Sequence, residues 1–373
     1  MKKVYIGIIA VFIAAGCGKN FSGLSHTENL YTSTVVDDTA DVGEYSSLAL
    51  DSSGNPYIAY YDLTDRSLRM AYWSSTSNGW VVMTVDPGNG ADVGMFSTLA
   101  LNKSQQPVIA YYDNTHGQLK LAVANGNKLT TGSFTITVVD GGKDGNVGGY
   151  ASLAINDSDQ PVISYFDFTH NALKVAIGTQ SGYNITTVDS LGVIGLYTSD
   201  AIDPKGNPAI SYYDASNGLL KYAHFTGSTW SITTVDGGNG LDAGRYTSLA
   251  IRSDGTPFIS YYDATNEQLK CAWFDNSNNR WSLNIADGTY GVGTDTSLAL
   301  DSYGYPHITY FDGINGKLRY TWYNGVGWER DIVDGVGVVG LYSSLKLDAN
   351  DQAHISYRDY KNRWLKYASY RMF

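Results

Sequence analysis

The segment YTSLAIRSDGTPFISYYD (residues 246–263) decides the fold, because recognisable copies of it occur seven times along the chain. The copies begin at Tyr45, Phe96, Tyr150, Tyr197, Tyr246, Asp295 and Tyr342. Their spacings are 51, 54, 47, 49, 49 and 47 residues. A regular repeat of this length indicates one supersecondary unit per copy, with each unit packed against its neighbours.

Each repeat contains four short strand-like runs. In the fifth repeat they are YTSLAIR, PFISYYD, QLKCAWFD and WSLNIAD, separated by turn-forming residues such as SDGT and NSNN. The composition includes 30 Tyr and 41 Gly, and no long stretch has helical periodicity. The pattern predicts an all-β fold over residues 30–373, a seven-bladed β-propeller of four-stranded antiparallel blades.

The two ends of the chain fit a closed ring. The seventh repeat supplies only three strands, YSSLKLD, AHISYRD and WLKYASYR. The missing fourth-strand pattern occurs at residues 31–37, YTSTVVD, with Tyr31 six residues before Asp37 as in the other repeats. We expect this N-terminal strand to complete the last blade, which removes the exposed edges of an open array.

The first residues read as an export signal. Lys2 and Lys3 precede an apolar run over 4–15 that is too short to span a bilayer. The sequence Ala14-Ala15-Gly16-Cys17 resembles the lipobox of bacterial lipoproteins. That resemblance implies a signal peptide over 1–16, lipidation of Cys17 and a tether over 17–29. It also implies a place in the cell envelope, and Gly18 favours the outer membrane over the inner one. The alternative is an ordinary signal peptide with an incidental Cys.

Net charge and cysteine content limit the classes of binding partner and the disulfide bonds that the chain can have. The formal net charge of −11 becomes −13 when Lys2 and Lys3 are removed, and no basic cluster is present, so nucleic acid is not an expected partner. The membrane is expected to be contacted only through the lipid. Cys17 and Cys271 are the two cysteines, so the mature fold has no internal disulfide, and Cys271 is expected to be a small core residue.

One motif with chemical potential is repeated too often to be a single active site. Asp263, Thr265 and Lys270 have counterparts in most repeats. An Asp at a strand end can accept the N–H two residues on, and a Lys on the next strand can neutralise it. We interpret this trio as a structural hairpin motif; the alternative is a binder with several similar sites.

The residues that open the first strand of each repeat are expected to lie nearest the central funnel. A Gly stands two residues before each of them, for a positive φ or a close backbone approach. The aromatic ones suit the apolar C–H faces of sugar rings, although they could also simply pack between blades. These candidate ligand-binding residues are Tyr45, Phe96, Tyr150, Tyr197, Tyr246 and Tyr342.

Departures from the repeat are further candidates. Asp295 replaces the funnel aromatic, Arg358 replaces an aromatic at the end of a second strand, and Arg245 lies in a long loop. We expect these three near one rim, where they could hold an anion or a sugar; drift at solvated positions is the alternative. Asp200 replaces a core Leu and Lys346 a small Ala, so each must reach water or find a partner.

Evidence for a cofactor or for catalysis is weak. Three longer loops, 86–92, 140–146 and 236–242, are rich in Asp, Asn and Gly and could offer oxygens to Ca²⁺; the candidate ligands are Asp86, Asp92, Asp236 and Asp242. They match no complete calcium motif, so no cofactor is expected apart from this weak candidate. The chain has neither HExxH nor GxSxG, and only four Glu, so no carboxylate pair for glycoside hydrolysis can be assigned.

The pattern SLALDSSGNPYIAYYD (47–62) resembles repeats of bacterial secreted propellers in the broad BNR/sialidase-like group, over residues 30–373. The Asp-boxes of that group are incomplete here: STSNGW (75–80) and TGSTW (226–230) lack the Asp. The strands also resemble those of fucose-binding propeller lectins. Three hypotheses follow: a non-catalytic binding module for a glycan or a partner protein, a glycan-active hydrolase or lyase with its site at the funnel, and a structural envelope component.

Overall fold

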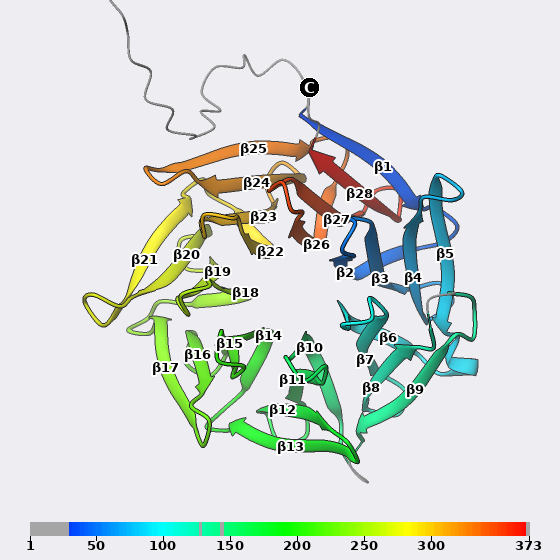
Figure 1. The fold of residues 1–373 in the computed structure, drawn as a ribbon. Helices are drawn as coiled ribbons and strands as arrows, with labels where there is room; N and C mark the ends of the chain where they lie inside the picture. Colours follow the sequence, from blue (N-terminus) through cyan, green and yellow to red (C-terminus); the bar gives the residue numbers. More distant parts are fainter. Residues whose placement is uncertain (1–29, 127–128, 142–144, 371–373) are drawn as a thin grey trace, which may run out of the picture.

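The computed structural model describes residues 30–126, 129–141 and 145–370. They form seven four-stranded antiparallel sheets arranged around a central axis (Figure 1). The predicted seven-bladed β-propeller is therefore confirmed. The predicted signal peptide, Cys17 and the tether lie outside the described residues. In the part of the chain described, no helix is long and apolar enough to cross a membrane.

In the first six blades the strands are numbered from the axis outward, and in the seventh the outer strand is β1. The innermost strands are β2 (Val42–Leu50), β6 (Val93–Leu101), β10 (Val147–Ile155), β14 (Ile194–Ile202), β18 (Ala243–Ile251), β22 (Val292–Leu300) and β26 (Val339–Leu347). The second strands are β3 (Pro56–Asp62), β7 (Pro107–Asp113), β11 (Pro161–Asp167), β15 (Pro208–Asp214), β19 (Pro257–Asp263), β23 (Pro306–Asp312) and β27 (Ala353–Asp359). The third strands are β4 (Ser67–Ser74), β8 (Gln118–Ala124), β12 (Ala172–Thr179), β16 (Leu219–Phe225), β20 (Gln268–Asp275), β24 (Lys317–Tyr323) and β28 (Trp364–Tyr370). The outer strands are β5 (Gly79–Asp86), β9 (Phe134–Asp140), β13 (Gly182–Asp189), β17 (Trp230–Gly237), β21 (Arg280–Asp287), β25 (Trp328–Asp334) and β1 (Tyr31–Asp37), and one short 3-10 turn, η1 (Gly88–Gly90), follows β5.

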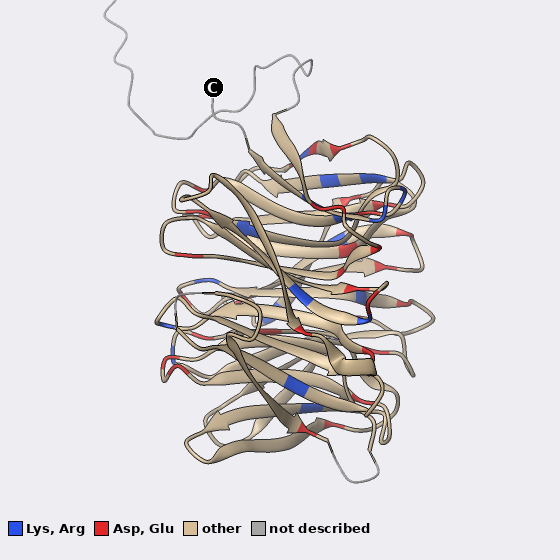
Figure 2. Ribbon diagram, turned by 90° about the vertical axis from the view of Figure 1, so that its right-hand side faces the viewer, with Lys and Arg blue, Asp and Glu red and all other residues tan. Residues whose placement is uncertain are grey.

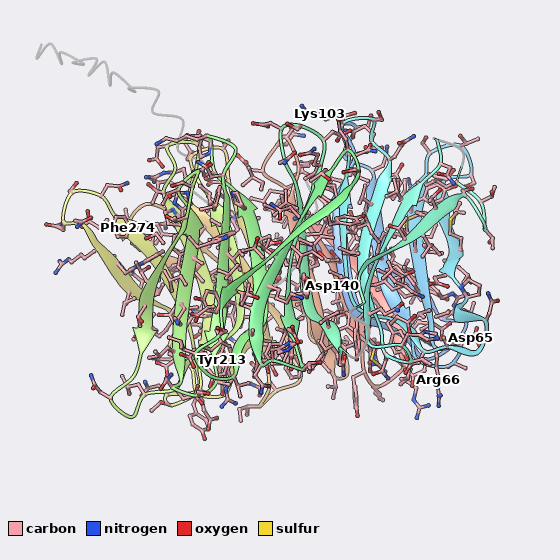
Figure 3. All side chains as sticks on the ribbon, turned by 90° about the horizontal axis from the view of Figure 1, so that it is seen from below. Asp65, Arg66, Lys103, Asp140, Tyr213 and Phe274 are labelled. Atoms are coloured by element: carbon pink, nitrogen blue, oxygen red, sulfur yellow. The ribbon has the colours of Figure 1, made fainter. Side chains whose placement is uncertain are left out.

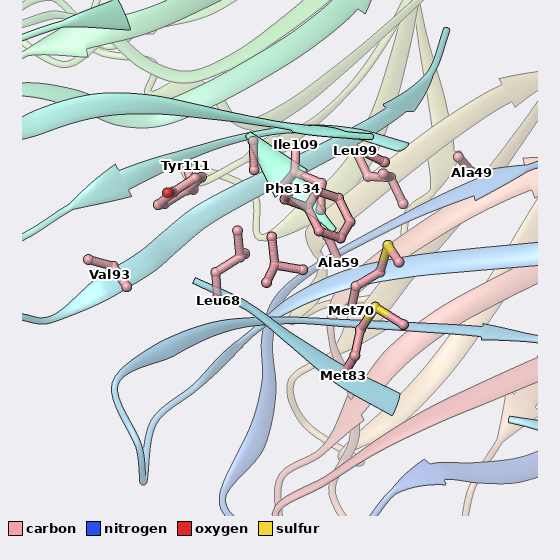
Figure 4. Packing of buried hydrophobic residues seen from close by; sticks show 13 residues of the cluster. Ala49, Ala59, Leu68, Met70, Met83, Val93, Leu99, Ile109, Tyr111 and Phe134 are labelled. Atoms are coloured by element: carbon pink, nitrogen blue, oxygen red, sulfur yellow. The ribbon is translucent and has the colours of Figure 1, made fainter. Parts of the chain in front are cut away.

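The hydrophobic core lies between blades. Buried apolar side chains of the described residues gather in clusters that each join two neighbouring blades. At the first junction, Met70 and Met83 of one blade face Ile109 and Phe134 of the next (Figure 4). Because both faces of most blades are covered, the second strands carry buried residues at nearly every position. Cys271 is fully buried in such a cluster, as predicted.

The N-terminal strand closes the ring as predicted. The seventh sheet has the order β1-β28-β27-β26, and Tyr31 pairs with Tyr370 in antiparallel register. Val36 of β1 packs in one cluster with Val42 of the first blade. The two ends of the described chain are therefore held in the same blade.

The innermost strands differ from the prediction at their starts. They begin three residues before the aromatic residue, with β2 starting at Val42 rather than Tyr45. The register shifts between Glu44 and Ser47, which marks a bulge, and Tyr45 has φ 53°. Gly43 has φ 92°, and a Cβ there would meet the Leu365 Cα at 3.1 Å. The bulge was not predicted because the alternation of apolar residues carries no mark of a left-handed backbone.

The molecule has two distinct rims. One rim carries the turns between second and third strands, such as 63–66, and the loops that enter the innermost strands, such as 38–41. We call it the ring rim, because the residues that form a ring around the axis lie near it. The opposite rim carries the remaining turns. Asp65 and Arg66 lie on the ring rim and Lys103 on the opposite rim (Figure 3). Acidic residues concentrate at the strand ends and turns of both rims (Figure 2).

Candidate ligand-binding site

A cavity of about 230 Å³ opens at the propeller axis near the ring rim. Its lining includes one residue from each innermost strand, at the same position of every repeat. We call these the ring residues: Tyr45, Phe96, Tyr150, Tyr197, Tyr246, Asp295 and Tyr342. All of them have φ between 51° and 55°. The bulge thus places six aromatic side chains and one carboxylate around a single space.

The aromatic ring residues pack against each other in sequence around the axis. The ring centroids of Tyr45 and Phe96 are 4.7 Å apart, and those of Tyr197 and Tyr246 are 4.6 Å apart. The series is interrupted between Tyr246 and Tyr342, where Asp295 stands. Most ring residues also contact an aromatic residue at the end of their own second strand, as Tyr45 contacts Tyr61 at 6.3 Å. Contacts of this kind hold the cavity wall in place.

Hydroxyl groups behind the ring fix its backbone. Ser97 Oγ donates to the Tyr45 carbonyl at 2.8 Å, and Ser47 Oγ accepts the Leu99 N–H at 2.9 Å. The residues that make the first kind of bond to the preceding blade are Ser46, Ser97, Thr198, Thr247, Thr296 and Ser343. Because these hydroxyls serve neighbouring blades, the polar groups left to face a ligand are mainly the tyrosine hydroxyls and the Asp295 carboxylate.

The cavity is electrostatically unusual. Burial raises the pKa of Tyr45 to about 12, and burial also raises the pKa of Tyr150, so the phenols stay protonated at neutral pH. Burial raises the pKa of Asp295 from 3.8 to about 6, against the lowering effect of hydrogen bonds from the Tyr342 N–H and the Thr294 side chain. The carboxylate is therefore mostly ionised at neutral pH.

The three rim candidates, Asp295, Arg358 and Arg245, are not linked to one another by a hydrogen bond or an ion pair in the described part of the chain. Asp295 lines the cavity, whereas Arg358 is buried in an ion pair with Asp41 at 2.5 Å and a second one with Glu44. Arg245 pairs with Asp242 at 2.5 Å. No hydrogen bond or ion pair among the described residues links any two of Asp295, Arg358 and Arg245. Arg358 instead neutralises Asp41 of a loop and Glu44 of β2, and Arg245, which lies in β18 and not in a loop as expected, neutralises Asp242.

The repeated trio has a structural role that extends between blades. Asp263 accepts the Asn266 N–H at 3.0 Å, and the Thr265 hydroxyl accepts the Asp242 N–H at 2.7 Å, which ties the hairpin to the adjacent loop. Lys270 lies 3.8 Å from Asp263 but is hydrogen-bonded to Asp236, the last Asp of the outer strand in the preceding blade.

Sequence reasoning missed this contact between blades. In the third blade, Tyr165 donates to Asp140 of the second blade at 2.6 Å and Lys174 contacts the same oxygen at 2.5 Å. The signal was present, since the outer-strand Asp and the second-strand Tyr both occur in every repeat. The sequence does not show how neighbouring blades are placed relative to each other, and this placement is what brings the Asp of one blade to the Tyr of the next.

The weak calcium candidates are engaged by protein groups. Asp86 accepts from Tyr111 at 2.6 Å, Asp92 from Tyr61 at 2.7 Å, and Asp242 from Tyr213 at 2.7 Å. Asp236 accepts from Tyr261 at 2.6 Å. No group of three or more His, Cys, Asp or Glu suited to a metal ion occurs within the described parts of the chain.

No protein-family model matches the chain, and no curated protein matches it by sequence. Among solved structures it is similar to the polysaccharide lyase Uly1, with 9% identity over 95% of both chains and a TM-score of 0.60. It is also similar to a protein of unknown function from Dyadobacter fermentans DSM 18053, with 9% identity over 92% of this chain and 100% of that one and a TM-score of 0.57. AofleA from Arthrobotrys oligospora has 14% identity over 84% of this chain and 92% of its own, with a TM-score of 0.55. At these identities the likeness concerns the propeller fold alone.

Proposed function

We propose that this protein is a lipid-anchored, non-catalytic binding module of the cell envelope that holds part of a glycan in its axial cavity. The observation that carries the proposal is the ring of six aromatic side chains around one space of about 230 Å³. This volume lies below the roughly 300–1,000 Å³ of sites for drug-sized molecules, so it fits a single sugar unit of a longer chain.

The backbone of the ring supports a binding role. A left-handed conformation costs a residue other than Gly on the order of 1 kcal/mol, and all seven ring residues adopt it. A fold that needed only this backbone conformation could use Gly at these positions, without a side chain. The tyrosine hydroxyls add donors and acceptors beside apolar ring surface, a combination that suits a sugar with both C–H faces and hydroxyl groups.

The charge of the cavity favours binding over hydrolysis. Glycoside hydrolysis commonly uses two carboxyl groups on either side of the scissile bond. Among the described residues that line the cavity, Asp295 is the one carboxylate, and none is a His, Lys or Arg. The wall therefore offers surfaces that orient a ligand but lacks the second carboxyl group that this kind of hydrolysis uses.

The proposed anchor and the cavity would face different directions. Strand β1 begins at Tyr31, beside Tyr370, and ends at Asp37, beside Leu365 and the ring-rim turn 360–363. Tyr31 therefore lies toward the opposite rim, and a tether over 17–29 would join the propeller there. A Cys17→Ala variant should then move from the membrane fraction to the soluble fraction; retention in the membrane would contradict the anchor.

Binding is tested with a soluble form beginning at residue 18 on a glycan array, followed by titration calorimetry with each saccharide retained. Tyr150→Ala and Tyr197→Ala should weaken binding about tenfold or more, because each removes stacking surface from the wall. Tyr303→Ala, at an exposed residue of the opposite rim, is the matched control and should leave binding unchanged. Release of reducing ends or unsaturated products from the same saccharides would contradict the non-catalytic role. If the array retained no saccharide, the proposal that the cavity binds a glycan would be contradicted.

A further inference from the structure

Asp295 stands where the other six repeats have an aromatic residue, and it has no cationic partner among the described residues. Its Oδ1 accepts the Tyr342 N–H at 3.1 Å. No Lys, Arg or His among the described residues forms an ion pair with it, whereas the aspartates at blade junctions do, as Asp140 does with Lys174 and Asp37 with Arg69. A half-buried charge without a counter-ion is unfavourable unless something else supplies one.

The two arginines expected near this rim are already paired with other carboxylates. Arg245 is held by Asp242, and Arg358 by Asp41 and Glu44. The titratable groups of neighbouring blades that interact with the Asp295 charge are phenols, those of Tyr197, Tyr246 and Tyr342, and their raised pKa keeps them neutral. Each phenol lies in the same wall as the carboxylate. The cavity therefore carries one net negative charge at neutral pH.

Aromatic rings and a carboxylate are together the groups that hold organic ammonium ions. A cation near an aromatic ring is attracted by its quadrupole, by about 0.5–2 kcal/mol according to its desolvation. A hydrogen bond from an ammonium to a carboxylate adds a charge-assisted contact. An anionic sugar would instead meet like charge in a partly desolvated space, which costs affinity.

We propose that the axial cavity selects a sugar carrying a free ammonium group, a deacetylated hexosamine, with the ammonium at Asp295 and the sugar ring against the aromatic wall. This inference rests on the proposed glycan-binding function and adds the charge of the ligand to it. Asp295 is then the residue that determines specificity, and the other ring residues supply general affinity.

The test compares three probes by titration calorimetry at neutral pH: a glucosamine oligosaccharide, its N-acetylated counterpart and choline. The free amine form should bind roughly tenfold more tightly than the acetylated form, the size expected for one charge-assisted contact. Asp295→Asn should abolish that preference while keeping the acceptor for the Tyr342 N–H. Asp38→Asn, which removes one exposed charge from the same rim, should preserve it.

Asp295→Tyr is a second variant that removes the charge by restoring the residue of most other repeats. It keeps the inference testable if Asp295→Asn fails to fold. Equal affinity for the two sugars, or a preference that survives in both Asp295 variants, would overturn the inference while leaving glycan binding intact. Binding of choline with no binding of either sugar would overturn the amino sugar and the glycan proposal together. If none of the three probes bound, both proposals would likewise be overturned.

Discussion

Arg358 and Asp41 form an ion pair of 2.5 Å that joins the last blade to the first. At the next junction the same place is occupied by Tyr61, whose hydroxyl donates to Asp92 at 2.7 Å. Arg358 is only 3% exposed and also pairs with Glu44. The exchange of Tyr for Arg therefore replaces a hydrogen bond from a neutral hydroxyl with two ion pairs at the junction between the last blade and the first.

Replacing Arg358 with Ala should destabilise the closed ring. Removing one partner of a buried ion pair costs about 3–5 kcal/mol, and we expect about 2–3 kcal/mol here because Asp41 and Glu44 are partly reached by water. Chemical denaturation measures the change. Arg358→Tyr is the matched control, because a Tyr could donate to Asp41 as Tyr61 does to Asp92, and it should recover part of the loss. Unchanged stability in Arg358→Ala would show that the pair does not hold the junction.

Asp200 should make stability fall as pH rises. Its Oδ1 is buried without a hydrogen-bond partner, and burial raises its pKa from 3.8 to about 8. Between those values the folded protein keeps a proton that the unfolded chain releases, so rising pH favours the unfolded state. Relative to Asp200→Asn, the wild type should lose about 1.4 kcal/mol per pH unit across this window.

The measurement is the free energy of unfolding of both proteins at a series of pH values from 4 to 8. Asp200→Leu restores the residue of the other repeats and should behave like Asp200→Asn, without the slope. If all three proteins show parallel pH profiles, the carboxyl group is ionised in the folded state, in contact with water.

The architecture could be predicted from the sequence because it depends on features that the chain repeats. Seven copies of one strand pattern determine the number of blades, and the Tyr31–Asp37 pattern shows which strand closes them. The location of Asp295 and its neighbours at the axis was predicted on the same basis. The burial of Cys271 was predicted because its counterparts in other repeats are apolar or aromatic.

What could not be predicted depends on geometry across junctions. The partner of Lys270 is Asp236 of the preceding blade, 34 residues away. The partners of Arg358 are Asp41 and Glu44, more than 300 residues away. A site uniting Arg358, Arg245 and Asp295 was expected because Arg358 and Asp295 break the repeat near the rim that Arg245 also faces. Each arginine instead pairs with carboxylates other than Asp295. An alignment of the repeats does not show which of several carboxylates on one rim an arginine will pair with.

The left-handed backbone of the ring predicts an unusual order of stability. Tyr197→Gly and Tyr197→Ala both lose the same side-chain contacts, but Gly adopts φ 53° without strain. The Gly variant should therefore be more stable than the Ala variant by about 1 kcal/mol. At Ser211, in a regular second strand, the order should reverse, with Ala more stable than Gly. Thermal unfolding compares the four proteins, and the same order at both positions would contradict the strained ring.

Removal of β1 should open the ring. A chain beginning at Asp38 loses the strand that pairs with β28, and it also loses Asp37, which accepts from Tyr60 at 2.6 Å and Arg69 at 3.0 Å. The edge of β28 would then be unpaired and prone to association. We expect a lower unfolding temperature and larger species in size-exclusion chromatography, compared with a chain beginning at Leu30. A peptide of residues 30–37 added in excess should restore both properties by mass action, and a scrambled peptide should not. A shortened chain that remains monomeric and equally stable would show that closure does not depend on the N-terminal strand.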